Sequence, residues 1–290
     1  MRFATDFNDY ELIDAVGGQR LERWKDIILI RPDPQVIWNG EIKDPRWKEA
    51  HAIYHRSNSG GGYWETLKPV PDVWSIKYRN LIFRLKPMGF KHTGLFPEQA
   101  INWAYAADKI RNAGRKITVL NLFAYTGGAT LACLEAGAAV THVDASKGMV
   151  QWAKENALAC GLSEASVRWL VDDCLKFVKR EIRRGNKYDA IIMDPPSYGR
   201  GPNGEIWKLE QQIGELLSEV SKLLSDEPLF FILNSYTGGL SPTILNFMVK
   251  TLVGKNTKCE VFTDEIGLKI SARDIIMPCG NTTILTYDEK

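Results

Sequence analysis

The sequence predicts an α/β protein in which a mostly parallel sheet, flanked by helices and closed by an antiparallel strand, follows a smaller β-rich domain. From about residue 117, short β-rich runs alternate with helical patterns, which is typical of βαβ units. The last two strand-like runs, "KCEVFTDEI" and "DIIMPCGNTTILTY", have no helix between them, so we expect an antiparallel closure. The first stretch of the chain instead holds short alternating runs, "DIILIRP", "QVIW" and "LIFRLKP", between Gly and Pro clusters. We therefore predict domains over 1–90 and 91–290.

The composition is that of an ordinary globular protein, with 290 residues, 44% hydrophobic and 25% charged. No apolar run approaches the length of a membrane span and the start has no basic and apolar leader, so we expect a cytoplasmic protein without a membrane contact. The five cysteines form no CxxC pair, so we expect neither a disulfide framework nor a metal site.

The predicted elements of the larger domain follow each other regularly. Strands are expected at 117–123, 139–144, 167–171, 188–194 and 229–234, and helices near 128–136, 147–160, 174–184, 207–225 and 243–253. The last helix has Ser241 as N-cap and Pro242 at its first position. Ligands of such a sheet bind at the carboxyl ends of the strands, so the residues that close each strand are the candidates for a site.

The first strand runs into a tight turn at Thr126, Gly127 and Gly128, where the backbone can pass close to a ligand. The G-x-G-x-x-G fingerprint is absent, which argues against a dinucleotide and favours a cofactor with a nucleoside but no phosphate. A turn that only connects strand to helix is the alternative.

Acids close the next two strands. Asp144 ends the second strand, 17 residues after Gly127, near the spacing at which an acid accepts hydrogen bonds from ribose hydroxyls. After the third strand, Asp172 or Asp173 can accept from the exocyclic amine of an adenine, or can instead N-cap the next helix.

The fourth strand ends in "MDPPSYGRG", in which two consecutive prolines fix the backbone after Asp194. Pro195 and Pro196 remove two N–H donors, so the preceding carbonyls can accept from a planar group, and Tyr198 can stack on a base. A merely rigid turn is the alternative.

Together these segments resemble the class I S-adenosylmethionine-dependent methyltransferases, and in particular the group that contains the bacterial 23S rRNA cytosine-carbon-5 methyltransferase. The resemblance covers about 90–290 and lies in "NLFAYTGG", "HVDASKGMVQWAKENA", "VDDCLKF" and "MDPPSYG". It implies a Rossmann-like sheet, S-adenosylmethionine as cofactor and an RNA partner. The cofactor residues that it implies are Phe123, Tyr125, Thr126, Gly127, Gly128, Asp144, Ala145, Ser146, Asp173, Cys174, Asp194 and Pro195.

The segment "KHTGLFPEQ" is similar to the stretch that precedes the sheet in that family. This resemblance implies that Phe96 and Gln99 line the cofactor pocket, although Ala100 stands where the family usually has Arg. Long members of the family begin with a PUA domain, and the first ~90 residues are too few for both that domain and a β-rich middle module, so we interpret them as the middle module alone.

Carbon-5 methylation of a pyrimidine requires a cysteine thiolate at a strand end. Ser197 and Tyr236 stand where the resemblance would place that cysteine, and only Cys279 lies in a loop that can reach inward. Transfer to a nitrogen or an oxygen needs only alignment and a proton acceptor, and Asp194, Tyr198 and Asn234 are candidates for positioning an amine.

Residues 1–116 carry 19 Lys+Arg against 14 Asp+Glu, and "KFVKREIRRGNK" holds six cations in twelve residues. Both features suit a polyanion partner, and a solvated surface explains each as well. The sequence therefore predicts a methyltransferase that acts on RNA, most simply at a nitrogen. The alternatives are a small-molecule or protein methyltransferase, a cofactor-binding protein without catalysis and an NAD-dependent oxidoreductase.

Overall fold

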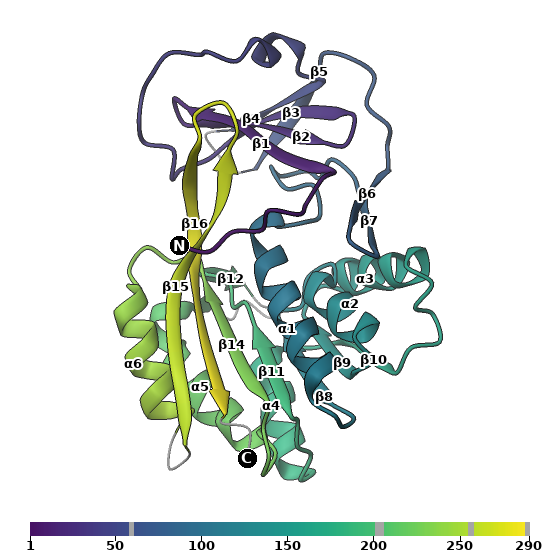
Figure 1. The fold of residues 1–290 in the computed structure, drawn as a ribbon, viewed down its shortest axis with the longest axis vertical. Coiled ribbons are helices and arrows are strands. Elements are labelled where there is room, and N and C mark those ends of the chain that lie inside the picture. The colour runs from purple at the N-terminus through teal and green to yellow at the C-terminus, as the bar shows by residue number, and fades with distance from the viewer. Residues whose placement is uncertain (58–60, 201–205, 255–257, 288–290) are drawn as a thin grey trace. The chain divides into compact units, whose positions relative to one another are not determined.

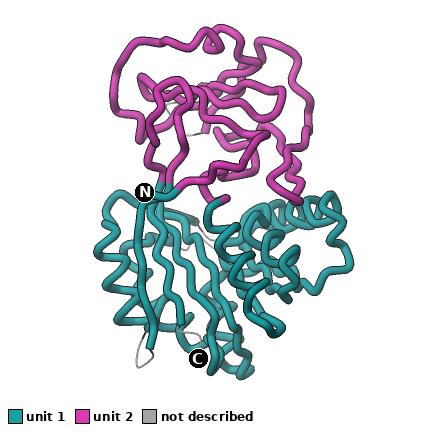
Figure 2. Tube along the Cα trace, viewed as in Figure 1, with its two compact units in different colours: residues 1–2, 101–266, 280–290 teal, residues 3–100, 267–279 magenta. Residues whose placement is uncertain are grey.

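The computed structural model describes residues 1–57, 61–200, 206–254 and 258–287. The chain divides into two compact units (Figure 2). Unit 1 contains residues 1–2, 101–266 and 280–290, and unit 2 contains residues 3–100 and 267–279. The segment 267–279 therefore belongs to unit 2 although it follows most of unit 1 along the chain.

Unit 1 contains a mostly parallel sheet with the strand order β10-β9-β8-β11-β14-β16-β15 (Figure 1). Its strands are β8 (Thr118–Leu122), β9 (Ala139–Asp144), β10 (Val167–Val171), β11 (Ala190–Met193), β14 (Phe230–Ser235), β15 (Cys259–Ile270) and β16 (Ile275–Tyr287), the last two of which continue into unit 2. The pairs among β8, β9, β10, β11 and β14 are parallel, and β16 runs antiparallel to β14. This confirms the predicted sheet and its antiparallel closing strand.

Helices cover both faces of this sheet. They are α1 (Ala100–Asn112), α2 (Gly128–Glu135), α3 (Lys147–Ala159), α4 (Cys174–Arg183), α5 (Leu209–Val220), which continues as a 3₁₀ turn over Ser221–Leu223, and α6 (Pro242–Leu252). Successive residues of β11 point to opposite faces, so Ile191 packs with α4, α5 and α6 whereas Ile192 packs with α1 and α2. Strands buried on both faces explain the continuous apolar runs in the sequence.

Helix α6 begins where the sequence predicts a cap. Ser241 accepts a hydrogen bond from the backbone N–H of Ile244 and Pro242 occupies the first position of α6. Helix α1, which begins directly after "KHTGLFPEQ", was not predicted from the sequence. No helix in the described ranges is both long enough and apolar enough to span a membrane.

Unit 2 is rich in β structure, as predicted. Its strands are β1 (Tyr10–Val16), β2 (Gln19–Trp24), β3 (Ile27–Pro32), β4 (Ala52–Arg56), β5 (Gly62–Thr66), β6 (Trp74–Tyr78) and β7 (Leu81–Leu85), with 3₁₀ turns at Pro45–Glu49 and Pro97–Gln99. Strands β1 to β5 are hydrogen-bonded in chain order, β1 also pairs with β15 at Ile270, and β6 and β7 form a separate hairpin. The alternating run "QVIW" does not form a strand: the carbonyls of Val36 and Trp38 accept hydrogen bonds from the backbone N–H groups of Gly18 and Gly17 in the turn between β1 and β2.

Candidate active site

The residues that follow the parallel strands of unit 1 meet at one edge of the sheet. The registers pair Leu122 with both Val143 and Met193, and Met193 with Leu233. The turn after β8, Asp144, Asp194 and Asn234 are therefore neighbours along this edge, although they are far apart in the sequence. This edge is the carboxyl end of the sheet, where such folds bind their ligands.

The turn after β8 has an unusual backbone. Phe123, Tyr125 and Gly127 have φ of 55°, 51° and 91°, respectively, in the left-handed region that non-glycine residues seldom adopt. Phe123 and Tyr125 are not glycines, so this left-handed conformation costs conformational free energy at both positions. Left-handed backbone in non-glycine residues concentrates at functional sites, where the surrounding structure holds it in place.

Asp144 holds this turn from the neighbouring strand. Its Oδ2 accepts from the backbone N–H of Tyr125 at 2.8 Å, and its Oδ1 accepts from the backbone N–H of Ser146 at 2.8 Å. Burial raises the pKa of Asp144, and these two hydrogen bonds oppose the rise. Because an ionised carboxylate has about four acceptor positions, Asp144 can also accept from two vicinal hydroxyls.

Ser146 and Ala145 follow Asp144 at the start of α3. The hydroxyl of Ser146 accepts from the backbone N–H of Met149 and so caps the helix, and Ala145 is exposed beside it. The serine therefore positions the turn after β9.

The two glycines of the turn pack closely against side chains of neighbouring helices. A Cβ at Gly127 would lie 3.0 Å from the Cβ of Ala153, and a Cβ at Gly128 would lie 2.5 Å from Cζ2 of Trp103. Packing on α3 and α1 therefore requires both glycines, a reason that the sequence did not reveal. Thr126, which precedes them, is buried, and its carbonyl accepts from the side-chain amide of Asn156 at 2.9 Å.

The acids after β10 both have protein partners. Asp173 caps α4 by accepting from the backbone N–H of Lys176, which is the alternative role considered above, and Asp172 pairs with Arg180. The thiol of Cys174 is buried and accepts from the backbone N–H of Phe123 at 3.3 Å. The side chain of Cys174 thus supports the first turn, and its backbone N–H, at the first position of a helix, is the group available to a ligand.

The Asp-Pro-Pro segment is held by a hairpin that the sequence did not predict, formed by β12 (Tyr198–Arg200) and β13 (Ile206–Lys208). The indole N–H of Trp207 donates to the carbonyl of Pro196 at 2.6 Å, and its ring lies against Phe123, with ring centroids 5.6 Å apart. Trp207 therefore joins the turn after β8 to the turn after β11. Nothing in the local sequence around Trp207 indicates this role.

Ser197 is fixed as well. Its carbonyl accepts from the backbone N–H of Leu209 at 3.1 Å, and its hydroxyl accepts from the hydroxyl of Thr237, in the loop after β14, at 2.6 Å. Tyr198 follows with half of its surface exposed. Pro196 and Ser197 thus have their acceptors occupied by the protein, whereas Pro195 is buried and Asp194 half-buried at the strand end.

Asn234 lies in β14 and is buried. Its Oδ1 accepts from the hydroxyl of Thr282 at 2.6 Å and from the side chain of Asn102 at 3.0 Å. These bonds link β14 to β16 and α1, which favours a structural role for Asn234 over the catalytic one predicted.

Phe96 and Gln99 belong to unit 2. Phe96 precedes the 3₁₀ turn Pro97–Gln99 and packs against His92, with ring centroids 5.1 Å apart, while Gln99 is buried. Their part in a cofactor pocket stays a prediction. In the described part of the chain, no three His, Cys, Asp or Glu side chains gather in a way that can hold a metal ion.

The fold and these strand ends define a class of enzyme, the Rossmann-like methyltransferases. The crystal structure of a SAM-dependent methyltransferase from Agrobacterium tumefaciens has a TM-score of 0.92 and 32% sequence identity, covering 98% of this chain and 92% of that chain. The family model of S-adenosylmethionine-dependent methyltransferases matches residues 48–235. The chain belongs to this family, and S-adenosylmethionine is its cofactor.

Curated relatives share part of the sequence. The ribosomal RNA large subunit methyltransferase K/L of Shewanella frigidimarina is 36% identical over 145 residues, 49% of this chain and 20% of that protein. The protein of the same name from Cellvibrio japonicus is 30% identical over 184 residues, 61% of this chain and 24% of that protein. The chain therefore spans no more than a quarter of the length of these relatives.

The geometry fits this cofactor. Asp144 presents a carboxylate whose position is set by two backbone N–H groups and which retains acceptor capacity for the two ribose hydroxyls.

Proposed function

We propose that this methyltransferase modifies RNA, specifically large-subunit ribosomal RNA, and that the acceptor is a nitrogen with its own lone pair. The observation that carries the RNA substrate is the similarity to two ribosomal RNA large subunit methyltransferases. A ribosomal RNA substrate would place the protein in the cytoplasm, in agreement with the prediction from the sequence.

The cysteines support a nitrogen acceptor. Burial raises the pKa of Cys133 to about 12, and burial also raises those of Cys174 and Cys279 well above the usual value. Because only a thiolate adds to a pyrimidine ring, these three side chains are poor nucleophiles. Cys279, the candidate left open by the sequence, is 4% exposed, and its thiol donates to the carbonyl of Met277 within β16.

The Asp-Pro-Pro segment supports the same acceptor. S-Adenosylmethionine, when bound, supplies a methyl group on a positively charged sulfur. The contribution of the protein is to hold the acceptor nitrogen in line with that carbon and to accept a hydrogen bond from its N–H. Asp194 and the carbonyl of Pro195 stand at the strand end for this purpose, in a segment that hydrogen bonds from Trp207, Leu209 and Thr237 to Pro196 and Ser197 hold in place.

Labelled methyl transfer tests the proposal. The pure protein and S-adenosylmethionine are incubated separately with the RNA, protein and small-molecule fractions of cells that lack it, and modified nucleosides are identified by mass spectrometry. We expect label in large-subunit rRNA as an N-methylated nucleoside. Label only in protein or small molecules would refute the RNA substrate, and a 5-methylpyrimidine would refute the nitrogen acceptor.

A further inference from the structure

Unit 1 contains a pocket at the end of the sheet opposite the methyl-transfer site. It has a volume of about 270 Å³ and lies at the first residues of β8, β9 and β10, beside the loop that leads into β11. We call it the amino-end pocket. It is lined by Thr118, Ala139, Val140, Thr141, Ser166, Val167, Arg168, Asn186, Lys187 and Tyr188.

A buried carboxylate organises one wall of this pocket. Glu181, on α4, has a fully buried side chain, and its Oε2 accepts from the hydroxyl of Tyr188 at 2.7 Å and from Asn186 at 2.8 Å. Desolvation raises the pKa of Glu181, but hydrogen bonds, first among them that from Tyr188, outweigh the burial and bring this pKa below its usual value. Glu181 is therefore ionised at neutral pH and can orient cations.

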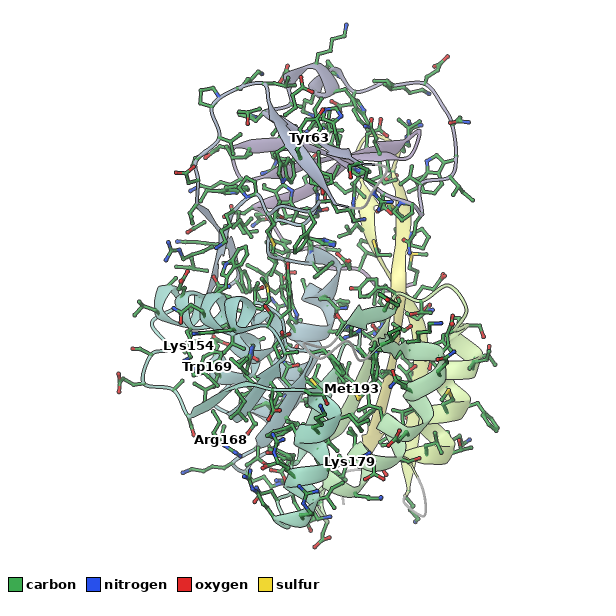
Figure 3. All side chains as sticks on the ribbon, turned by 180° about the vertical axis from the view of Figure 1, so that it is seen from behind. Tyr63, Lys154, Arg168, Trp169, Lys179 and Met193 are labelled. Atoms are coloured by element: carbon green, nitrogen blue, oxygen red, sulfur yellow. The ribbon has the colours of Figure 1, made fainter. Side chains whose placement is uncertain are left out.

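Two guanidinium groups are fixed on that carboxylate. Arg168 contacts its Oε2 at 3.4 Å and Arg184 contacts its Oε1 at 3.0 Å, yet their side chains remain 50% and 57% exposed. Each guanidinium has five N–H donors, so a single contact leaves donors that point to solvent. Figure 3 labels Arg168 on β10, next to Trp169 and in the same unit as Lys179 of α4.

The pocket wall is cationic. Arg168 and Lys187 are the charged members of its ten lining residues, and both are positive. The ammonium group of Lys187 donates to the carbonyl of Lys222 at 2.6 Å, and Ser166 adds a hydroxyl, whereas the hydroxyl of Thr118 donates to Asp189. A planar guanidinium, an ammonium group and a hydroxyl around a small hollow suit a phosphate group.

We propose that the amino-end pocket binds a backbone phosphate of the RNA substrate through Arg168 and Lys187, as a second contact separate from the methyl-transfer site. This inference rests on the proposed RNA substrate and deepens it. Five residues separate Thr118 in the pocket from Phe123 at the carboxyl end of β8, roughly 16 Å of extended chain. Only a ligand longer than that reaches both sites, so the substrate is a folded RNA segment rather than a free nucleotide.

Salt-dependent RNA binding tests this inference. The affinity of the full-length protein for a large-subunit rRNA transcript is measured across a series of salt concentrations, for wild type and for the double variant Arg168→Gln, Lys187→Gln. Glutamine at position 168 retains an N–H group that can donate to the carboxylate of Glu181. The control, Lys154→Gln with Lys250→Gln, removes the same charge from exposed sites on α3 and α6. If the double variant does not fold, the single variant Lys187→Gln replaces it in the measurement, because the side chain of Lys187 is exposed.

Loss of two phosphate contacts should reduce the magnitude of the slope of log affinity against log salt by about 1.6 and weaken binding by about 40-fold near 0.1 M salt. We expect this for the Arg168 and Lys187 variant and not for the control, with S-adenosylmethionine affinity unchanged in both. Equal slopes in the two variants would overturn the inference while leaving the proposed function intact if rRNA is still methylated.

A second experiment distinguishes two possible ligands of the amino-end pocket, a phosphate of the RNA backbone and a free anion. Inorganic phosphate is titrated while the backbone amide signals of residues 166–168 and 186–188 are followed by nuclear magnetic resonance. Shifts with phosphate together with the RNA effect support the inference. Shifts with phosphate but an unchanged RNA slope would show a site for a free anion and would overturn the inference. If wild type neither binds nor methylates rRNA, the proposed function itself fails.

Discussion

The backbone N–H of Tyr125, a residue in left-handed conformation, donates to Oδ2 of Asp144 at 2.8 Å, so the turn after β8 and the acid after β9 form one unit. Asp144→Asn should weaken S-adenosylmethionine binding by about ten- to a hundredfold, because hydrogen bonds to a charged acceptor contribute about 1.5–3 kcal/mol. Isothermal titration calorimetry measures this change. Asp108→Asn, at an exposed acid on α1, should bind as wild type does.

The pH dependence of cofactor binding tests the same carboxylate. Burial raises the pKa of Asp144 above the usual 3.8. Since the ribose hydroxyls donate to the ionised form, binding should weaken as the pH falls through this raised pKa, sooner than for an ordinary aspartate. Affinity that stays flat down to the usual pKa would contradict this role.

Trp207 should act on methyl transfer rather than on cofactor affinity. Trp207→Phe keeps a ring against Phe123 but removes the donor to the carbonyl of Pro196, which we expect to lower kcat about fivefold, as for the loss of about 1 kcal/mol. Steady-state kinetics with rRNA as substrate measure this change in kcat. Trp169→Phe on β10 is the matched control, and an equal loss of kcat there would show that Trp207 has no special part.

His142 should make the protein sensitive to mild acid. It is fully buried, and burial lowers its pKa to about 3, against 6.5 in the unfolded chain. Below pH 6.5 the unfolded state binds a proton that the folded state does not, so stability is lost as the pH falls, by about 2 kcal/mol at pH 5. His142→Gln, compared with wild type in denaturant unfolding at pH 7.5 and pH 5, should show a smaller loss. Identical losses would contradict the prediction.

Thiol chemistry should be dispensable for methyl transfer. We expect Cys279→Ala to retain methyl transfer to rRNA, because the thiol is buried and its pKa lies well above the usual value. Brief treatment of wild type with iodoacetamide at pH 8 should likewise leave the activity in place. Loss of activity in the Cys279→Ala variant, with its melting temperature unchanged, would favour a covalent mechanism instead.

Gly128→Ala should destabilise unit 1. The added methyl group would lie 2.5 Å from the ring of Trp103, and overpacking of this kind costs about 1–3 kcal/mol. Thermal unfolding measures the loss. The control Gly214→Ala in α5, with no atom within 4 Å of the added carbon, should not lower stability, because alanine favours a helix.

The sequence predicted the sheet, its flanking helices and the positions of Asp144 and Asp194, because strand and helix periodicities and the residues that end each strand are local features. It did not predict Trp207 on Pro196 or Trp103 beneath Gly128, because these contacts join segments that only the fold brings together. It attributed both glycines to a ligand, whereas protein packing also requires them. The strand-end position of Asn234 was predicted correctly, but its hydrogen bonds to Asn102 and Thr282 come from distant parts of the chain.

The return of residues 267–279 to unit 2 has a consequence for how the protein can be divided. Ile270 pairs with Leu12 of β1, and Leu268, Ile270, Met277 and Cys279 are buried in the segment that returns. A cut near residue 100 would therefore separate β1 from β15, one of its two partner strands, and remove these four buried side chains from unit 2. Neither unit is encoded by one continuous stretch of the gene, so a single genetic break cannot transfer either unit whole.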